Sequence, residues 1–259
     1  MDFANAAFLA AVGFAGGVVT AIVGAASLLT FPALLAAGVP PVLASASNCV
    51  AMTPSNFVAA WADYRRLPPF RPAFLRVIAI AAIGSGLGAW LLMVTPDASF
   101  EKLVPLLIGA ATALFAFSGN VRRWIIRHDE DAALHSARAD RIGLVLLGPL
   151  AVYAGYFGAG VGIVLLAILS LGPKSEFRTV NALKNLLSGT TGVVAMIVFI
   201  AKGMVAWPPT LALLMGALTG GYVGARIARV VPEPLVRWIV IVVGVTVTAV
   251  FMRRYWWPD

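Results

Sequence analysis

The sequence predicts an all-α polytopic membrane protein with about eight transmembrane helices. Its 259 residues are 61% hydrophobic and only 12% charged, whereas a soluble domain carries about 25% charged residues. The apolar residues form blocks of about twenty, which is the length that a helix needs to cross about 30 Å of hydrocarbon. These blocks are continuously apolar, so they do not match the short alternating strands of a transmembrane barrel.

The apolar blocks place the predicted segments in order along the chain. They lie at roughly 6–36, 43–62, 73–95, 102–124, 142–171, 177–201, 207–228 and 233–252. The first and fifth are the longest, and both contain several glycines, among them Gly24 and Gly158. Long glycine-interrupted segments at corresponding places are typical of discontinuous helices beside a binding site. We therefore expect glycine-broken first and fifth segments, with close helix packing as the alternative role of these glycines.

A weak internal match at an offset of about 134 residues, which aligns Gly24 with Gly158, predicts two homologous four-helix halves. The predicted parts are an N-terminal repeat at 1–124, a polar linker on the cytoplasmic side at 125–141 and a C-terminal repeat at 142–259. Lysine and arginine counts near the segment ends favour both termini in the cytoplasm. The sequence leaves open whether the halves are parallel or are inverted by a first segment that re-enters its own side.

The net charge of +8 follows from membrane topology rather than from nucleic-acid binding. The basic residues flank the apolar blocks, and no basic run is interleaved with aromatic residues. Such an arrangement is typical of the loops of a membrane protein. The lipid bilayer is therefore the expected partner, and no nucleic acid is expected.

The most informative polar residue is Lys184, which lies about a third of the way along the sixth segment. A lysine at the centre of a membrane helix costs roughly 2.5–3.5 kcal/mol on insertion scales, so it tends to face a cavity or a partner. The nearest carboxylates sit at segment ends: Asp63, Asp97, Glu101, Glu176 and Glu233. The sequence therefore predicts a small anionic substrate near Lys184. The alternative is a lysine whose ammonium snorkels toward the membrane surface.

Small polar residues extend this prediction over two segments. At 100° per residue, the sixth segment presents a face with Lys184, Asn181, Asn185 and Ser188, and the second segment presents a stripe with Ser45, Asn48, Ser55 and Asn56. We predict a substrate-binding site formed by Lys184, Asn181, Asn185, Ser188, Asn48, Ser45 and Ser47. Backbone amides at the glycine breaks Gly24, Gly158, Gly160 and Gly162 are predicted to bind the anion or to act as gates, because half-helix N-termini favour negative charge. Helix-to-helix hydrogen bonding is the alternative role of the polar faces.

The sequence carries no pattern of an enzyme. It lacks metal-ligand spacing of His or Glu, a GxSxG elbow, a Walker loop and paired intramembrane aspartates. We therefore expect no catalysis, no metal and no cofactor. The single cysteine, Cys49, is interpreted as a packing residue, although it would be the best nucleophile if the chain were a membrane enzyme. His128 and His135 are interpreted as solvated residues of the linker.

Two stretches of the chain resemble a known family. TFPALLAAGVPPVLASASNCVAMTPSNFVAAWADYRR, from Thr30 to Arg66, resembles the first-repeat signature of the TauE/SafE sulfite exporter family, and VNALKNLLSGTTGVVAMIVFIAKGMVAW, from Val180 to Trp207, is similar to its second-repeat signature. The likeness extends over nearly the whole chain and includes GALTGGYVGARIAR. This sequence differs from the family pattern at two places. Its first-repeat glycine stretch reads GAASLL, and it has SN at Ser47 and Asn48 where the family usually has TN.

The resemblance implies a transporter with duplicated four-helix halves, usually in the bacterial inner membrane. Its substrates would be sulfite, sulfonates such as sulfoacetate, or related organosulfur oxyanions. Asn48 and the face with Asn181, Lys184 and Asn185 fall in the signature segments. A secondary transporter or exporter is thus the leading hypothesis, and a membrane-embedded scaffold or assembly protein without transport is the alternative. The sequence leaves the coupling ion, the direction of transport and a homo-oligomeric state open.

Overall fold

The computed structural model describes residues 2–67, 73–127, 132–169, 177–228 and 233–257, and every regular element in these ranges is a helix. The elements are α1 (Phe3–Ile22), α2 (Ser27–Ala36), α3 (Pro41–Ala62), the 3-10 turn η1 (Tyr64–Arg66), α4 (Ala73–Val94), α5 (Asp97–Arg127), α6 (Ala132–Tyr156), α7 (Val161–Leu169), α8 (Phe177–Ala201), α9 (Trp207–Ile227) and α10 (Glu233–Trp256). The all-α prediction is confirmed. Of the predicted linker at 125–141, residues 128–131 lie outside the described ranges.

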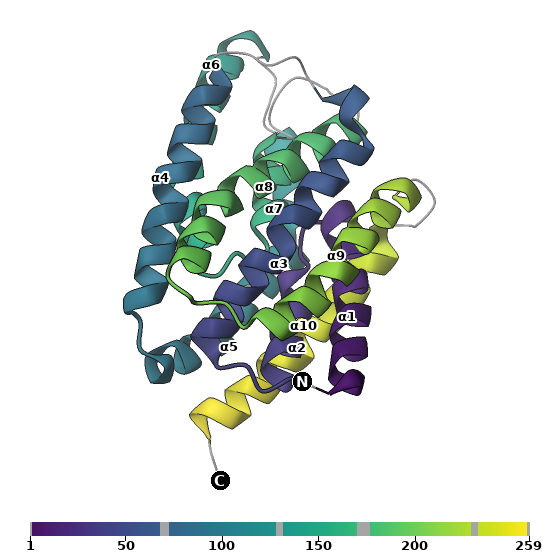
Figure 1. Ribbon diagram of the computed structural model, residues 1–259. Coiled ribbons are helices and arrows are strands. Elements are labelled where there is room, and N and C mark those ends of the chain that lie inside the picture. The colour runs from purple at the N-terminus through teal and green to yellow at the C-terminus, as the bar shows by residue number, and fades with distance from the viewer. Residues whose placement is uncertain (1, 68–72, 128–131, 170–176, 229–232, 258–259) are drawn as a thin grey trace.

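Five helices within the described ranges are long and apolar enough to cross a membrane. They are Phe3–Ile22, Phe74–Val94, Arg178–Ala201, Trp207–Ile227 and Val236–Trp256. The start of α1 and the end of α10 lie at the same end of the helix assembly (Figure 1). The chain is therefore a multi-pass membrane protein, while eight crossings and two four-helix halves stay predictions.

The chain reverses direction between α1 and α2. Gly24, in the connection, has a φ of 82°, a left-handed conformation that glycine adopts without strain. A Cβ atom at Gly16 of α1 would touch Thr30 of α2, so α2 runs back along the second half of α1. The first predicted segment is thus a helical hairpin with a long and a short arm.

A similar reversal joins α6 to α7. Gly158 and Gly160 in this connection have φ values of 74° and 78°. The Tyr153 hydroxyl of α6 donates a hydrogen bond of 2.8 Å to the Ala159 carbonyl, which closes the turn from within. A second hairpin therefore faces the first, and the two are the elements that shape the site described below.

Helices from the two predicted halves pack against each other through small residues. Along the α1–α9 contact, Gly13 lies against the Leu213 backbone and Gly220 lies against the Phe14 backbone, too close for a side chain at either glycine. The α4–α6 pair is built in the same way, with Gly88 against Val152. Close backbone approach at small residues is how helices associate in lipid. The two sequence halves therefore interleave.

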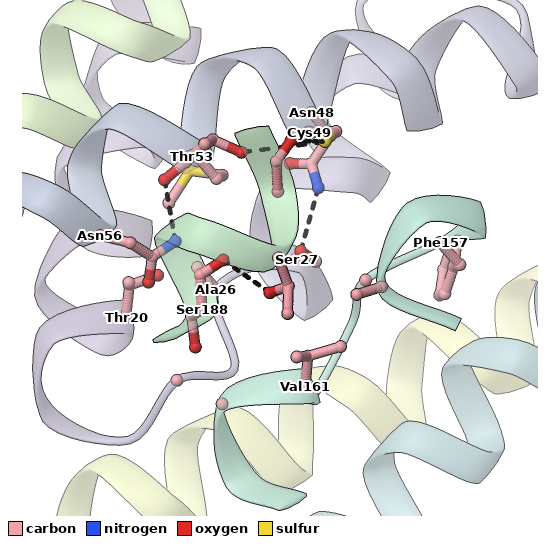
Figure 2. A pocket seen from close by; sticks show the side chains of 17 residues that line it. Thr20, Ala26, Ser27, Asn48, Cys49, Thr53, Asn56, Phe157, Val161 and Ser188 are labelled. Atoms are coloured by element: carbon pink, nitrogen blue, oxygen red, sulfur yellow. Dashed lines mark hydrogen bonds between the residues drawn. The ribbon is translucent and has the colours of Figure 1, made fainter. Parts of the chain in front are cut away.

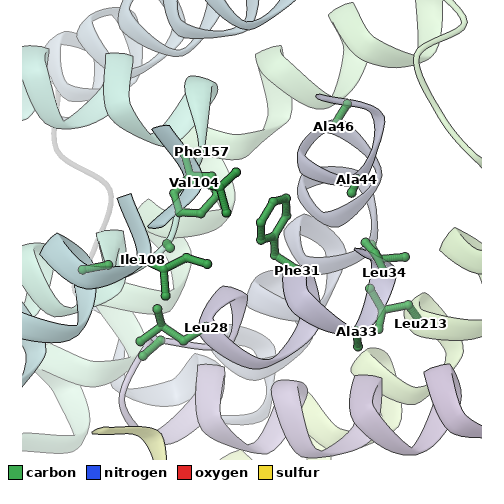
Figure 3. Close-up of a cluster of buried hydrophobic side chains, with 14 of the residues drawn as sticks. Leu28, Phe31, Ala33, Leu34, Ala44, Ala46, Val104, Ile108, Phe157 and Leu213 are labelled. Atoms are coloured by element: carbon green, nitrogen blue, oxygen red, sulfur yellow. The ribbon is translucent and has the colours of Figure 1, made fainter. Parts of the chain in front are cut away.

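A cluster of buried aromatic and aliphatic side chains packs between the two hairpins (Figure 3). Phe31 of α2 is fully buried and packs edge-on against Phe157, with ring centroids 5.1 Å apart, and against Phe100 at 6.4 Å. Leu28 and Ile108 belong to the same buried cluster. Because Phe157 lies in the α6–α7 connection, this packing joins α2 of the first hairpin to the turn of the second.

Candidate functional site

A small cavity lies where the two hairpins meet between α3 and α8 (Figure 2). Its water-accessible volume is about 70 Å³, and one water molecule needs about 10–15 Å³ on this measure. The cavity therefore has room for roughly five waters or a solute of a few heavy atoms. Its lining residues are Thr20, Gly24, Ala26, Ser27, Asn48, Cys49, Met52, Thr53, Asn56, Ala154, Phe157, Gly158, Val161, Gly162, Ser188, Thr191 and Gly192.

The two hairpins touch through glycine backbone. A Cβ atom at Gly24 would lie 2.7 Å from the Gly162 Cα, and a Cβ atom at Gly162 would lie 2.7 Å from the Gly24 Cα. Beside this contact, Ser27 begins α2 and Val161 begins α7, and both residues line the cavity. The amino ends of two short helices thus border one small space, where the helix dipoles favour negative charge. The Leu28, Leu29 and Ile163 amides already donate to carbonyls of the preceding turn.

Asn48 anchors α2 to α3 at the wall of the cavity. Its amide nitrogen donates 3.0 Å to the Ser27 hydroxyl, and its amide oxygen accepts a 2.5 Å hydrogen bond from the Thr30 hydroxyl (Figure 2 shows Asn48 and Ser27). Asn48 is only 2% exposed. Its side chain is thus held in one orientation by two residues of α2, and it sets the position of that helix's first turn.

Ser188 contributes the least satisfied polar group of the wall. Its hydroxyl oxygen is buried and has no hydrogen-bond partner among the described residues. Other hydroxyls on the same helix are satisfied locally, as Thr191 donates to the Leu187 and Ser188 carbonyls. An unsatisfied buried hydroxyl costs about 1–3 kcal/mol. A water or a polar solute in the cavity would remove that cost.

The predicted face with Asn181, Lys184 and Asn185 does not line the cavity. Instead, the Lys184 ammonium donates 3.0 Å to the Thr20 carbonyl, and the Asn181 and Asn185 amides donate 2.8 and 3.5 Å to the Ala21 carbonyl. Lys184 is fully buried, and a Cβ atom at Gly24 would lie 3.4 Å from its ammonium. The positive charge therefore lies directly behind the Gly24 wall of the cavity.

Other predicted site residues divide between the cavity and the helix contacts. Gly24, Gly158 and Gly162 line the cavity, whereas Gly160 does not. Ser45 donates to the Tyr156 carbonyl at 3.2 Å, and Ser47 accepts from the Ala206 amide at 3.0 Å, so both join helices outside it. The structure adds lining residues that sequence reasoning missed: Thr20, Ser27, Thr53 and Thr191. Small hydroxyl residues are common at helix contacts, so no sequence signal separated these four.

The lining chemistry favours binding over covalent chemistry. Hydroxyls, amides, backbone and apolar groups form the wall, and no Asp, Glu, His, Lys or Arg is among the lining residues. Within the described residues, no group of three or more His, Cys, Asp or Glu side chains could hold a metal ion. Cys49 lines the cavity, with its sulfur 3.8 Å from the Thr53 hydroxyl and from the Gly192 carbonyl. This arrangement can hold a small polar solute reversibly.

Comparisons with known proteins point to transport. A protein of Haemophilus influenzae named "Probable membrane transporter protein" is 28% identical, over 97% of this chain and 96% of its own length. "Probable membrane transporter protein ORF9" of a Sinorhizobium species is 27% identical over 92% of this chain and 89% of its own length. "Probable membrane transporter protein YfcA" of Escherichia coli K12 is 26% identical over 90% and 84%. No solved structure gives a significant match.

A family model described as "Sulfite exporter TauE/SafE" matches residues 9–252, which is nearly the whole chain. Together with the apolar helices, this match makes the chain a membrane transporter rather than an enzyme. The predicted resemblance is confirmed, and the protein belongs to the TauE/SafE sulfite exporter family.

Proposed function

We propose that this transporter moves small sulfur-containing anions, such as sulfite, sulfonates including sulfoacetate, or related organosulfur oxyanions, through the cavity between the two hairpins. The observation that carries the proposal is the meeting of two half-helix amino ends, at Ser27 and Val161, beside the unsatisfied Ser188 hydroxyl. The family name supports the sulfur oxyanion class.

The electrostatics of the site favour an anion over a cation. Helix amino ends carry partial positive charge, and hydroxyl and amide groups donate hydrogen bonds to oxyanions. The Lys184 ammonium, behind Gly24, adds a full positive charge close to the cavity. Charge interactions are strong where water is scarce. A cation in the same space would find no carboxylate among the lining residues.

The small volume of the cavity favours a compact solute. Space for roughly five waters accommodates an oxyanion headgroup, whereas a long organic tail would have to extend past the lining residues. A compact headgroup that is common to sulfite and sulfonates fits this limit. Substrates of this class would therefore share the headgroup contacts and differ in the contacts of the remainder.

We further propose that the hairpins α1–α2 and α6–α7 are the broken first and fifth segments of eight, each returning to the side from which it entered. The remaining segments would be α3, α4, α5, α8, α9 and α10. An odd number of full crossings in each half then gives the halves 1–124 and 142–259 opposite orientations. In a bacterial inner membrane, this arrangement places the 125–141 linker on the side opposite to both termini. With the linker in the cytoplasm, as predicted, both termini would face the periplasm, against the cytoplasmic termini that the lysine and arginine counts favoured for eight full crossings.

Ligand-dependent stability tests the proposed function. Purified protein in detergent is heated with sulfite, thiosulfate, sulfate, sulfoacetate, taurine or simple carboxylates, because a ligand that binds only the folded state raises the melting temperature. We expect stabilisation by sulfur oxyanions that is lost in Ser188→Ala. The matched control is Thr190→Val, since the Thr190 hydroxyl donates to the Leu186 carbonyl and does not line the cavity.

The outcome separates transport from the alternative roles. Selective stabilisation, followed by flux of the same anion into liposomes, would support the proposal. A well-folded protein that responds to no anion, or a Ser188→Ala variant that responds as fully as Thr190→Val, would contradict it. Absence of flux for every anion would instead favour a scaffold or assembly role in the membrane.

A further inference from the structure

We propose that Lys184 is a positioning residue, which holds the carboxyl end of α1 and thereby fixes the wall of the cavity, and that it acts on transport through α1 rather than by touching the solute. Lys184 would hold this end of α1 in the ligand-free protein, whichever anion is transported.

The last carbonyl groups of an α-helix lack partners within the helix. At the end of α1, the amides of Val23 and Gly24 both donate to the Val19 carbonyl, at 2.8 and 3.0 Å. The carbonyls of Thr20 and Ala21 therefore need donors from elsewhere. In lipid, a carbonyl that finds no donor is costly, since water is absent.

A single face of α8 supplies these donors. Lys184 donates to Thr20, and the Asn181 and Asn185 amides donate to Ala21. All three side chains are at most 5% exposed. A positive charge at the carboxyl end of a helix also interacts favourably with the helix dipole. These three side chains thus cap the carboxyl end of α1, although they lie about 160 residues from it in sequence.

The capped end of α1 leads directly into the cavity wall. Thr20, Gly24, Ala26 and Ser27 all line the cavity, so the segment that follows the cap forms one side of it. Gly24 also touches Gly162 of the second hairpin. Loosening the end of α1 would therefore displace the glycine contact, while Asn48 still holds the first turn of α2. Through these contacts, Lys184 holds the Gly24 side of the cavity in place although it does not line the cavity itself.

Hydrogen–deuterium exchange of the ligand-free protein in detergent tests the positioning role. We expect amide exchange at Val23 and Gly24 to accelerate by about tenfold or more in Lys184→Met, because hydrogen bonds from charged groups are among the stronger ones. Exchange in the α5–α10 pair, which is remote from Lys184, should stay at the wild-type rate. Asn181→Leu keeps the charge and removes one donor, and should accelerate the same amides to a smaller extent.

Two further measurements separate positioning from solute binding. Cys49 lines the same cavity from α3, so a neutral maleimide should label it faster in Lys184→Met than in wild type. Ser188→Ala should leave exchange at the end of α1 unchanged, because Ser188 makes no bond to that helix. Unchanged exchange at Val23 and Gly24 in both Lys184→Met and Asn181→Leu would overturn the inference. An anion panel without effect on wild type would instead contradict only the proposed function. If Lys184→Met does not purify, Asn181→Leu carries the test alone.

Discussion

The crossing of the two hairpins at Gly24 and Gly162 makes the most demanding prediction about this protein. Replacing Gly24 by alanine introduces two separate penalties. The φ of 82° is left-handed, which costs a residue with a side chain about 1–2 kcal/mol. The new Cβ would lie 2.7 Å from the Gly162 Cα, and relieving such crowding costs about 1–3 kcal/mol.

Two other glycines separate these penalties. Gly38 has a φ of 85° with nothing within 4 Å of a Cβ atom, so Gly38→Ala carries the conformational cost alone. Gly162→Ala carries the crowding cost, because a Cβ there would lie 2.7 Å from the Gly24 Cα. If the penalties add, Gly24→Ala should lose about 2–5 kcal/mol, more than either control.

Reversible unfolding of the purified protein in mixed detergent micelles measures these differences. The expected order of destabilisation is Gly24→Ala above Gly162→Ala and Gly38→Ala, and anion stabilisation should weaken in Gly24→Ala and Gly162→Ala only. A Gly24→Ala variant that is no less stable than Gly38→Ala would refute the close approach of the hairpins, and with it the cavity built on that contact.

Three further perturbations have expected outcomes. Asp63→Arg and Arg178→Asp should each lower the melting temperature, because the two side chains form an ion pair between the ends of α3 and α8. The double swap should recover the melting temperature, with a coupling of about 1 kcal/mol in a double-mutant cycle. Independent effects of the two changes would contradict this ion pair. Phe31→Ala, at a fully buried aromatic, should cost about 3–5 kcal/mol, against little for Phe117→Ala, whose side chain is 61% exposed; equal losses on unfolding would place Phe31 outside the core. A thiol reagent should modify the single cysteine, Cys49, and bound sulfoacetate, which does not consume the reagent, should slow the reaction, as followed by intact mass. If sulfoacetate stabilises the protein but leaves the labelling rate unchanged, Cys49 does not border the occupied space.

Much of the helical architecture could be predicted from the sequence. Composition and block length predicted a helical membrane protein, because both depend on the cost of burying polar groups in lipid. The helices α3, α8 and α9 begin and end within two residues of the predicted segments 43–62, 177–201 and 207–228. The signature stretches around Asn48 and Lys184 also led to the family that the full-length match confirms.

Only the tertiary structure decided which polar residues meet at the cavity. The prediction grouped Ser188 with Asn181, Lys184 and Asn185 because they share a helix face, yet Ser188 lines the cavity while the other three cap α1. Helix periodicity fixes a residue's direction around its own axis but not the neighbour that it meets. In lipid, that neighbour is selected by close packing and interhelical hydrogen bonds between residues far apart in sequence, such as Gly24 with Gly162 and Lys184 with Thr20, and no local pattern along the chain records those pairs.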